Sequence, residues 1–231
     1  MNGADSYGSY IVSQVKSLKK RLSNERRLAS PFVTISRQTG AYGITISQDL
    51  CEFLQKHEKR TQCVWTVFDK ELIEKVAEEH DLPKTVLPYL SEDTVSEIQD
   101  MIEEMLGLHP SHDALVLKTN KTILHLAQLG YCILVGRACF IVTSKMPGGM
   151  HIRLVSSLPK RIEHVQEYYH LTQREAKEFI YREEFKRRNY VKKYFQREIE
   201  DPLLYDLVIN VDNFPRQEII EIIGNLVLRP V

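Results

Sequence analysis

The chain has 231 residues, of which 43% are hydrophobic and 27% are charged, and its formal net charge is +0. This length suits one domain with a lid or subdomain and argues against a second full domain. The balanced charge leaves no domain-wide excess of Lys and Arg, so we expect no nucleic acid partner. The longest apolar run, residues 131–143, is shorter than the roughly 20 residues of a membrane span. We therefore expect no membrane span.

The cysteines and the N-terminus indicate the compartment. The four cysteines form no C-x-x-C pair, so we interpret them as buried reduced thiols. Residues 1–6 lack the basic and apolar regions of a signal peptide. Both observations predict a cytoplasmic protein.

Residues 9–29 carry apolar side chains at helical spacing, with lysines and arginines on the remaining faces. We predict an amphipathic basic helix and treat residues 1–29 as an N-terminal helical extension. Its ordinary interpretation is a helix that packs on the domain and leaves its basic face in solvent. Contact with a partner or with a membrane surface is the alternative.

Residues 32–45 have the layout of a phosphate-binding loop, in which a buried strand leads through a glycine-containing turn into a helix. We predict the strand over residues 32–36 and the helix over residues 43–57. Backbone N–H groups at such a turn, together with the dipole of the following helix, favour an anion.

The loop departs from the usual motif G-x-x-x-x-G-K-[ST]. Gly43 and Thr45 match it, whereas Gln38 replaces the first glycine and Ile44 replaces the lysine. Arg37 is the nearest cation that could stand in for the lysine. A strand, turn and helix without any ligand are the alternative interpretation.

Strands and helices alternate along the rest of the chain. Further strands are predicted over residues 64–68, 132–135, 151–155 and 207–211, and further helices over residues 70–80, 84–106, 111–129, 157–169, 172–198 and 215–228. This alternation predicts an α/β fold with a five-stranded parallel sheet and right-handed crossovers.

Charged residues follow three of the predicted strands directly. Arg37, Asp69 and Arg137 each come just past a strand end. Ligands of open parallel sheets bind outside the carboxyl ends of the strands, so these side chains predict a site there. Solvated loop residues are the alternative, and Asp69 also suits the N-cap of the helix that follows it.

Several of these segments resemble motifs of one known family. They are Ser36-Arg37-x-x-Gly40, Phe68-Asp69-Lys70-Glu71-Leu72, Val135-Gly136-Arg137 and the stretch at residues 203–210, in this order. Together they resemble the cytidylate-kinase-like family of P-loop proteins, over roughly residues 30–228. The resemblance implies a single domain over residues 30–230 with a three-layer P-loop fold. It also implies a helical acceptor-binding insertion and a helical lid over approximately residues 157–200.

The resemblance implies roles for individual residues. The nucleotide and its phosphates would be bound by Ser36, Arg37, Gln38, Gly40, Gly43, Ile44 and Thr45. Thr45 would also contact Mg²⁺, and Asp69 and Arg137 would hold the acceptor. The arginines that act on the transferring phosphoryl group would be Arg37, Arg161 and Arg187.

The implied activity is transfer of a phosphoryl group from ATP or another nucleoside triphosphate, with Mg²⁺. The acceptor would be a nucleoside monophosphate such as CMP, or another small molecule. Ile44 at the lysine position and Phe185 in the lid depart from the family pattern. A nucleotide-binding regulatory protein with a degenerate loop and little or no kinase activity is therefore the alternative.

Overall fold

The computed structural model describes residues 30–59, 63–79 and 114–229, together with residues 10, 13, 14, 96 and 99–102. Most of the predicted basic helix at residues 9–29 therefore lies outside the described residues. The same holds for most of the predicted helix at residues 84–106.

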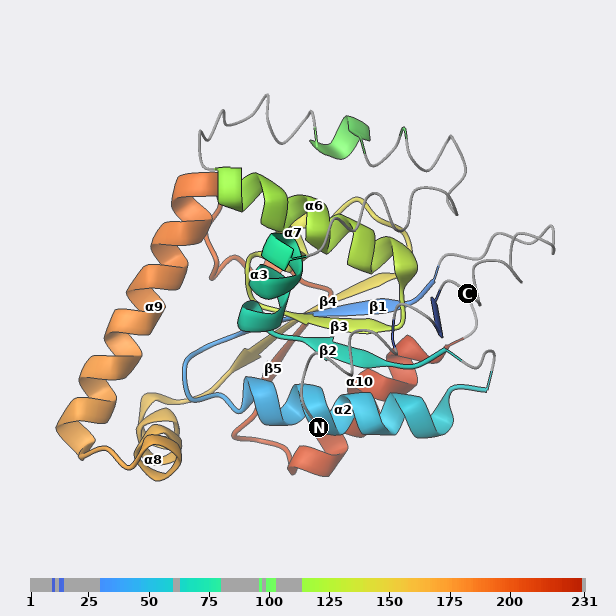
Figure 1. Cartoon of the computed structure of the whole chain (residues 1–231). Helices are drawn as coiled ribbons and strands as arrows, with labels where there is room; N and C mark the ends of the chain where they lie inside the picture. The colour runs from blue at the N-terminus through green and yellow to red at the C-terminus, as the bar shows by residue number, and fades with distance from the viewer. Residues whose placement is uncertain are drawn as a thin grey trace.

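The described chain is built around a sheet of five parallel strands in the order β2-β3-β1-β4-β5 (Figure 1). The strands are β1 (Phe32–Arg37), β2 (Thr66–Phe68), β3 (Cys132–Val135), β4 (Gly149–Val155) and β5 (Leu207–Asn210). β1 lies at the centre and pairs with β3 and β4 in parallel register. The predicted α/β class and the parallel sheet are confirmed.

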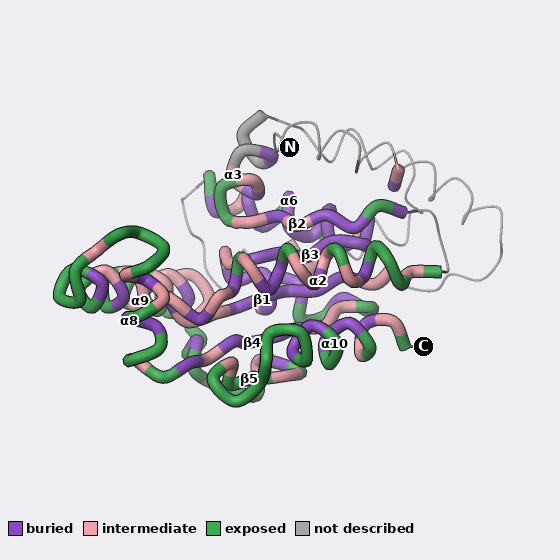
Figure 2. The backbone as a smooth tube through the Cα atoms, turned by 90° about the horizontal axis from the view of Figure 1, so that it is seen from below, coloured by how far each residue is buried: buried purple, intermediate pink, exposed green. Residues whose placement is uncertain are grey.

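Helices cover both faces of this sheet (Figure 1). One face packs against α2 (Gly43–His57) and α10 (Arg216–Val227), and the other packs against α3 (Lys70–Glu79), α6 (Ala114–Leu129) and the short α7 (Cys139–Val142). The strands alternate their side chains between two apolar cores, so Val33 and Ile35 face α2 while Phe32 faces α6. The inner strands β1 and β3 are accordingly buried along almost their whole length (Figure 2).

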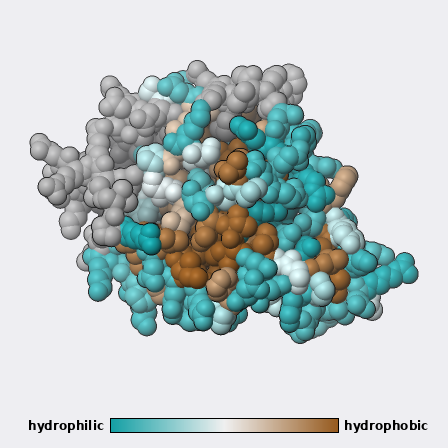
Figure 3. Space-filling model, turned by 180° about the vertical axis from the view of Figure 1, so that it is seen from behind, coloured by the Kyte–Doolittle hydropathy of each residue, from teal (hydrophilic) through white to brown (hydrophobic). Residues whose placement is uncertain are grey.

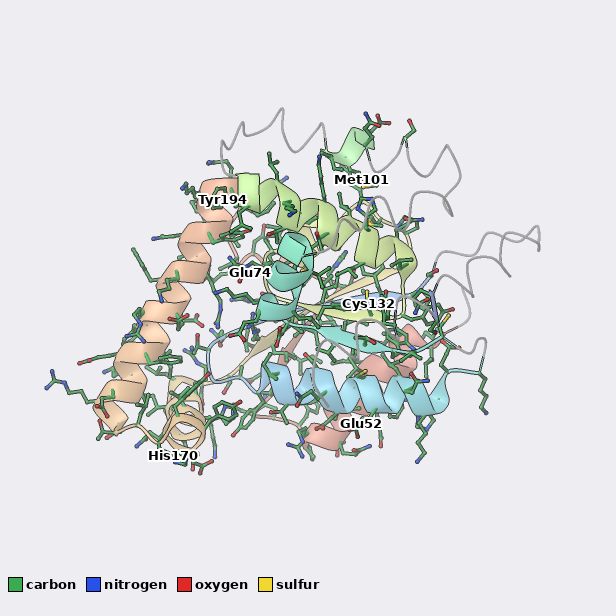
Figure 4. All side chains as sticks on the ribbon, in the orientation of Figure 1. Glu52, Glu74, Met101, Cys132, His170 and Tyr194 are labelled. Carbon is green, nitrogen blue, oxygen red and sulfur yellow. The ribbon has the colours of Figure 1, made fainter. Side chains whose placement is uncertain are left out.

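Two further helices, α8 (Leu158–Tyr169) and α9 (Gln173–Phe195), extend beyond the carboxyl ends of the strands (Figures 1 and 2). They pack on each other through a small apolar cluster of their own, made by Ile162, Val165, Ala176 and Ile180. Of the labelled residues, His170 ends α8 at the turn that leads into α9, and Tyr194 lies at the far end of α9, beside α6 (Figure 4). These helices are the part of the chain that the resemblance identifies with the lid.

Local signals set most helix boundaries. Thr172 forms the predicted capping box with Glu175, and Asp69 caps α3, because the amide of Leu72 donates to its Oδ1 at 2.8 Å. The predicted helix at residues 172–198 was too long, since Gln196 adopts φ 52° and ends α9 at Phe195.

Four strand boundaries also differ from the prediction, those at the ends of β1 and β5 by a single residue. β2 begins at Thr66 rather than at residue 64, and β4 begins at Gly149 rather than at residue 151. β5 is an edge strand, and its residue Val208 is 42% exposed. Apolar side chains also gather on the face of the molecule that is seen from behind (Figure 3). Within the described part of the chain, no helix is both long and apolar enough to cross a membrane.

Candidate functional site

The turn between β1 and α2 is held in an unusual backbone conformation. Gly40 has φ 86° and Tyr42 has φ 55°, both in the left-handed region. A Cβ atom on Gly40 would lie 2.6 Å from the carbonyl oxygen of Arg161, so this position requires glycine. Gln38 needs no such freedom, and its side chain instead accepts a hydrogen bond from the amide of Ser156 at 2.9 Å. The glutamine thus ties the turn to the end of β4.

The N-terminus of α2 has no side-chain cap. Tyr42, at the N-cap, makes no capping hydrogen bond, and the first turn contains no acidic residue. Its amide groups and the positive end of the helix dipole therefore remain available to an anion. The physical requirement for phosphate binding that the sequence predicted is present at this position.

A cavity of about 200 Å³, here named the loop cavity, lies in front of this helix end. Gln38, Gly40, Gly43, Ile44 and Thr45 line it from the turn. The opposite wall comes from α8 and α9 and is largely aromatic, formed by His164, Val165, Tyr168, Tyr169 and Phe179.

The turn and α8 are joined at this cavity. The rings of Tyr42 and His164 stack at 3.8 Å between centroids, and Nδ1 of His164 lies 2.9 Å from the carbonyl oxygen of Gly40. Ile44, at the position of the missing lysine, is 37% exposed and is not buried in the core. Its side chain therefore occupies the cavity wall without contributing a charge.

A second cavity, of about 300 Å³ and here named the Arg137 cavity, lies at the ends of β1 and β3. Five cationic side chains line it against a single carboxylate, that of Glu183. The cations are Arg37, Lys70, Arg137, Lys186 and Arg187. The remaining wall is mainly apolar and is formed by Ala138, Phe140, Tyr190, Val191 and Ile199. Such a cavity suits an anionic ligand that also has an apolar or aromatic part.

The two cavities share one wall, made by Arg37, Glu183 and Arg187. The side chain of Arg37 passes between two glycines: a Cβ on Gly43 would lie 2.6 Å from its Cγ, and one on Gly136 would lie 2.9 Å from its Nη1. Glycine at both positions is what allows this guanidinium to reach the junction.

Arg37 carries a charge that the described residues do not neutralise. No carboxylate of the described chain lies within 4 Å of its guanidinium, and the nearby cation Arg187 adds repulsion. Burial, and secondly the charge of Arg187, lowers the pKa of Arg37 to about 10. A bound anion would relieve both penalties.

Helix α9 contacts the turn through Glu184. Its Oε1 accepts a hydrogen bond from the amide of Thr39 at 2.6 Å and lies 3.6 Å from Nη1 of Arg187 and 3.8 Å from Nη1 of Arg161. Arg187 also donates to Oγ1 of Thr39 at 2.7 Å. A carboxylate of the protein itself therefore lies among donors that suit a phosphate.

Arg161 is placed differently from the other two predicted catalytic arginines. It lines neither cavity, although its carbonyl oxygen abuts Gly40 and its guanidinium faces Glu184. Its Nε and Nη1 are buried without a hydrogen-bond partner. Arg37 and Arg187, by contrast, meet at the junction of the cavities.

Arg137 is held by strong local constraints. It forms an ion pair with Glu74, which lies on the side of α3 that faces α9 (Figure 4), and its guanidinium lies 5.4 Å from the ring centroid of Tyr190. Gly136, Arg137 and Ala138 have consecutive positive φ angles of 90°, 47° and 53°. Such strained backbone persists where surrounding structure maintains it, often at functional sites.

Other predicted site residues lie at the edges of this arrangement. Asp69 lines neither cavity, and its observed contact is the cap of α3. Ser36, which the resemblance placed with the donor phosphates, lines the Arg137 cavity instead of the loop cavity. Thr45 lies in the first turn of α2, and its hydroxyl makes no hydrogen bond within the described chain.

No cluster of three metal-ligating side chains occurs among the residues that the structure describes. A magnesium ion that arrives with nucleotide phosphates needs few protein ligands, and the free hydroxyl of Thr45 fits one of them.

Sequence reasoning missed five charged residues of this site. Lys70, Glu183 and Lys186 line the Arg137 cavity. Glu184 contacts the turn, and Arg153 lies buried behind Ser36. The only sequence signal for Arg153 is a charge inside the otherwise apolar strand at residues 149–155. Glu183 and Glu184 belong to a helix with many charges of both signs, and this pattern is equally typical of an exposed helix face with ion pairs. The sequence therefore did not indicate that these two carboxylates belong to the site.

Comparison with known proteins places this geometry in a family. The model of the cytidylate kinase-like family matches residues 32–213, which include both cavities. No curated protein matches the chain in sequence.

Two solved structures are similar to the chain, and the first of them, with a TM-score above 0.5, shows the same fold. An uncharacterised protein from Eubacterium ventriosum is 16% identical, with a TM-score of 0.63, and the match covers 86% of this chain and 98% of that one. A shikimate kinase from Bacteroides thetaiotaomicron is 9% identical, with a TM-score of 0.47 and coverage of 85% and 98%. Because the family model spans residues 32–213, which is most of the chain, the chain belongs to the cytidylate kinase-like family.

Proposed function

We propose that this protein transfers a phosphoryl group from a nucleoside triphosphate to a small phosphorylated acceptor. The observation that carries the proposal is the junction of the two cavities at Arg37 and Arg187. A donor bound on one side and an acceptor bound on the other would meet between these two guanidinium groups.

The loop cavity suits the triphosphate. Its phosphates would lie against the uncapped N-terminus of α2, where backbone amides and the helix dipole favour negative charge. The aromatic wall from α8 and α9 offers a stacking surface for the base. Magnesium would neutralise part of the phosphate charge, with the hydroxyl of Thr45 as a protein ligand.

The Arg137 cavity suits the acceptor. Its cationic wall would hold a phosphate, and the apolar side formed by Phe140, Tyr190 and Val191 would contact an uncharged part of the molecule. A nucleoside monophosphate such as CMP meets both requirements, and the family to which the chain belongs supports that choice. Phosphoryl transfer requires little beyond positioning and stabilisation of phosphate charge, which Arg37 and Arg187 would supply.

The lid and the cell compartment complete the proposal. α8 and α9, approximately residues 157–200, would close over the phosphates as the lid of a single domain formed by residues 30–230. A cytoplasmic location accords with substrates of this class. The N-terminal helical extension remains a candidate partner contact.

One observation favours a second function, in which the protein binds nucleotides without efficient transfer. Ile44 lines the loop cavity at the position where the usual motif has lysine, so one cation that would contact the triphosphate is missing. Nucleotide binding without turnover would identify the protein as a regulatory member of its family.

The experiment that tests the proposal combines binding and turnover. Calorimetric titration with ATP and other triphosphates, with Mg²⁺, should show binding, and a panel of monophosphates should yield a diphosphate product. Arg37→Met should weaken triphosphate binding by roughly tenfold or more, because a charge-assisted hydrogen bond contributes about 1.5–3 kcal/mol.

Arg174→Met is the control, since Arg174 is 88% exposed, lines neither cavity and, among the described residues, pairs with Glu178 one turn along α9. Equal effects of the two substitutions would contradict the role of Arg37. Absence of any nucleotide binding by the unmodified protein would contradict the function itself.

A further inference from the structure

Arg153 is a buried arginine in the middle of the sheet. It lies on β4, is 4% exposed, and is paired in register with Ser36 of β1. Its strand neighbours Ile152 and Leu154 point into the core under α2 and α10. Arg153 therefore points to the opposite face, where the strand ends meet the Arg137 cavity.

The partners of this guanidinium are neutral. Nη1 of Arg153 donates to Oγ of Ser36 at 3.0 Å and lies 3.4 Å from Oη of Tyr205, whose ring centroid is 5.6 Å from the guanidinium carbon. Within the described chain no carboxylate lies within 4 Å of it. Arginine stays protonated in proteins, and a buried charge without a counter-charge is costly.

The position of this charge relates it to the Arg137 cavity. Ser36, Phe140 and Ile199 line that cavity. Tyr205 lies directly behind them, because its Oη donates to the carbonyl oxygen of Ile199 at 2.8 Å and its ring lies 4.7 Å from that of Phe140. Arg153 and Tyr205 thus form the floor beneath the cavity.

The hydrogen bonds around Ser36 determine whether its hydroxyl donates or accepts toward the cavity. Its Oγ accepts from Arg153, while the single proton of the Tyr205 hydroxyl has its shorter bond to Ile199. Within the described chain, the acceptor that remains for the hydroxyl proton of Ser36 is Oη of Tyr205 at a long 3.3 Å, so a ligand in the cavity competes with it for that proton. With its oxygen facing a cation, this hydroxyl is left to act as a donor.

We propose that Ser36 and Arg153 form an oxyanion subsite at the floor of the Arg137 cavity, which holds a phosphate of the acceptor. Ser36 donates its hydroxyl proton to the phosphate. Arg153 is a positioning residue: it orients that hydroxyl and supplies the buried positive charge that the phosphate neutralises. This subsite rests on the proposed function only in naming the phosphate as part of the acceptor.

Inorganic phosphate is the probe, because it requires no assumption about the base. Its dissociation constant is measured by calorimetry for the unmodified protein, Ser36→Ala, Arg153→Met and the double variant. Each single substitution should weaken phosphate binding by roughly tenfold, and the double variant should be little worse than Arg153→Met, because the two residues act as one unit. Ser144→Ala, which removes an exposed hydroxyl elsewhere, should have no effect.

Melting temperature separates this role from a structural one. Arg153→Met removes an uncompensated buried charge, so its melting temperature without phosphate should be unchanged or higher. A lower melting temperature with unaltered phosphate affinity would identify Arg153 as a structural arginine. If Arg153→Met does not fold, Ser36→Ala decides: unchanged phosphate affinity in this small substitution overturns the inference.

Triphosphate titration distinguishes failure of the inference from failure of the proposed function. Binding of triphosphate together with unaltered phosphate affinity in Ser36→Ala would refute the subsite and leave the kinase proposal standing. Phosphate binding that depends on Ser36 and Arg153, without any triphosphate binding, would support the subsite and refute the kinase proposal.

Discussion

Glu184→Gln tests whether the carboxylate of Glu184 on α9 competes with the phosphates of a ligand. The carboxylate is only 15% exposed, accepts the amide of Thr39 and lies within 4 Å of Arg161 and Arg187. Glutamine keeps the size and an acceptor oxygen but removes the charge. We expect the unliganded protein to become less stable and the affinity for triphosphate to rise.

The magnitude follows from the charges involved. Two unit charges 3.7 Å apart interact by about 4 kcal/mol at an effective dielectric constant of about 20, and desolvation and solvent screening offset most of this. A net loss of about 1–2 kcal/mol from the unfolding free energy is therefore expected. In the unmodified protein a bound triphosphate must replace the contacts of the Glu184 carboxylate, at the same cost of about 1–2 kcal/mol. Without that cost, triphosphate affinity should rise by roughly fivefold to thirtyfold.

Three measurements address this prediction: calorimetry with ATP or pyrophosphate, urea unfolding without ligand, and hydrogen exchange of the Thr39 amide. Exchange at Thr39 should become faster in Glu184→Gln. Glu183→Gln is the matched control, because this neighbouring carboxylate pairs with Lys186 and Arg182 instead of the turn. This control separates the effect of losing the contact between Glu184 and the turn from the effect of removing one negative charge near the cavities.

Two results would refute this reasoning. A fall in triphosphate affinity in Glu184→Gln would show that the carboxylate positions the arginines productively instead of competing with phosphate. An equal rise in Glu183→Gln would show that the effect is only a change in the overall field of the cavity.

Three further substitutions test individual parts of the site. Ile44→Lys restores the missing cation at an exposed position, so triphosphate affinity should rise roughly tenfold by calorimetry; Ile222→Lys on α10, of matching 38% exposure, should have no effect. Arg137→Met should weaken monophosphate binding roughly tenfold while the melting curve changes little, and unfolding would instead mark a structural arginine. Gly40→Ala should cost roughly 1–3 kcal/mol in urea unfolding, because φ 86° and the contact with Arg161 both oppose a Cβ. Gly148→Ala shares a positive φ of 82° away from the turn, and an equal cost there would contradict the importance of that contact.

Local chemistry in the sequence determined the elements and their class. The apolar run at residues 132–135 is a strand buried along its whole length, and α2 begins and ends where glycine and helical periodicity predicted, at Gly43 and His57. Thr172 and Glu175 form their capping box because its hydrogen bonds join residues three apart in sequence. Such interactions need no tertiary contact, so sequence patterns could predict them.

The position of Arg37, Asp69 and Arg137 past three strand ends could also be predicted, because parallel strands share one carboxyl edge. Which of these side chains meet could not. Arg37 reaches the junction of the cavities by passing between two glycines, while Asp69 turns to cap its own helix. Side-chain direction at a strand end depends on neighbours that the sequence order does not specify.

The remaining site contacts join residues far apart in the chain. Thr39 and Glu184 are separated by 145 positions, and Ser36 and Arg153 by 117. Each contact depends on strand register and on how α9 packs against the turn, both of which follow from burial of the two cores. The sequence by itself determined the strands, the helices and the loop that favours an anion. Only the tertiary structure decided that the carboxylate of Glu184 would lie on that loop and that a buried arginine would lie behind Ser36.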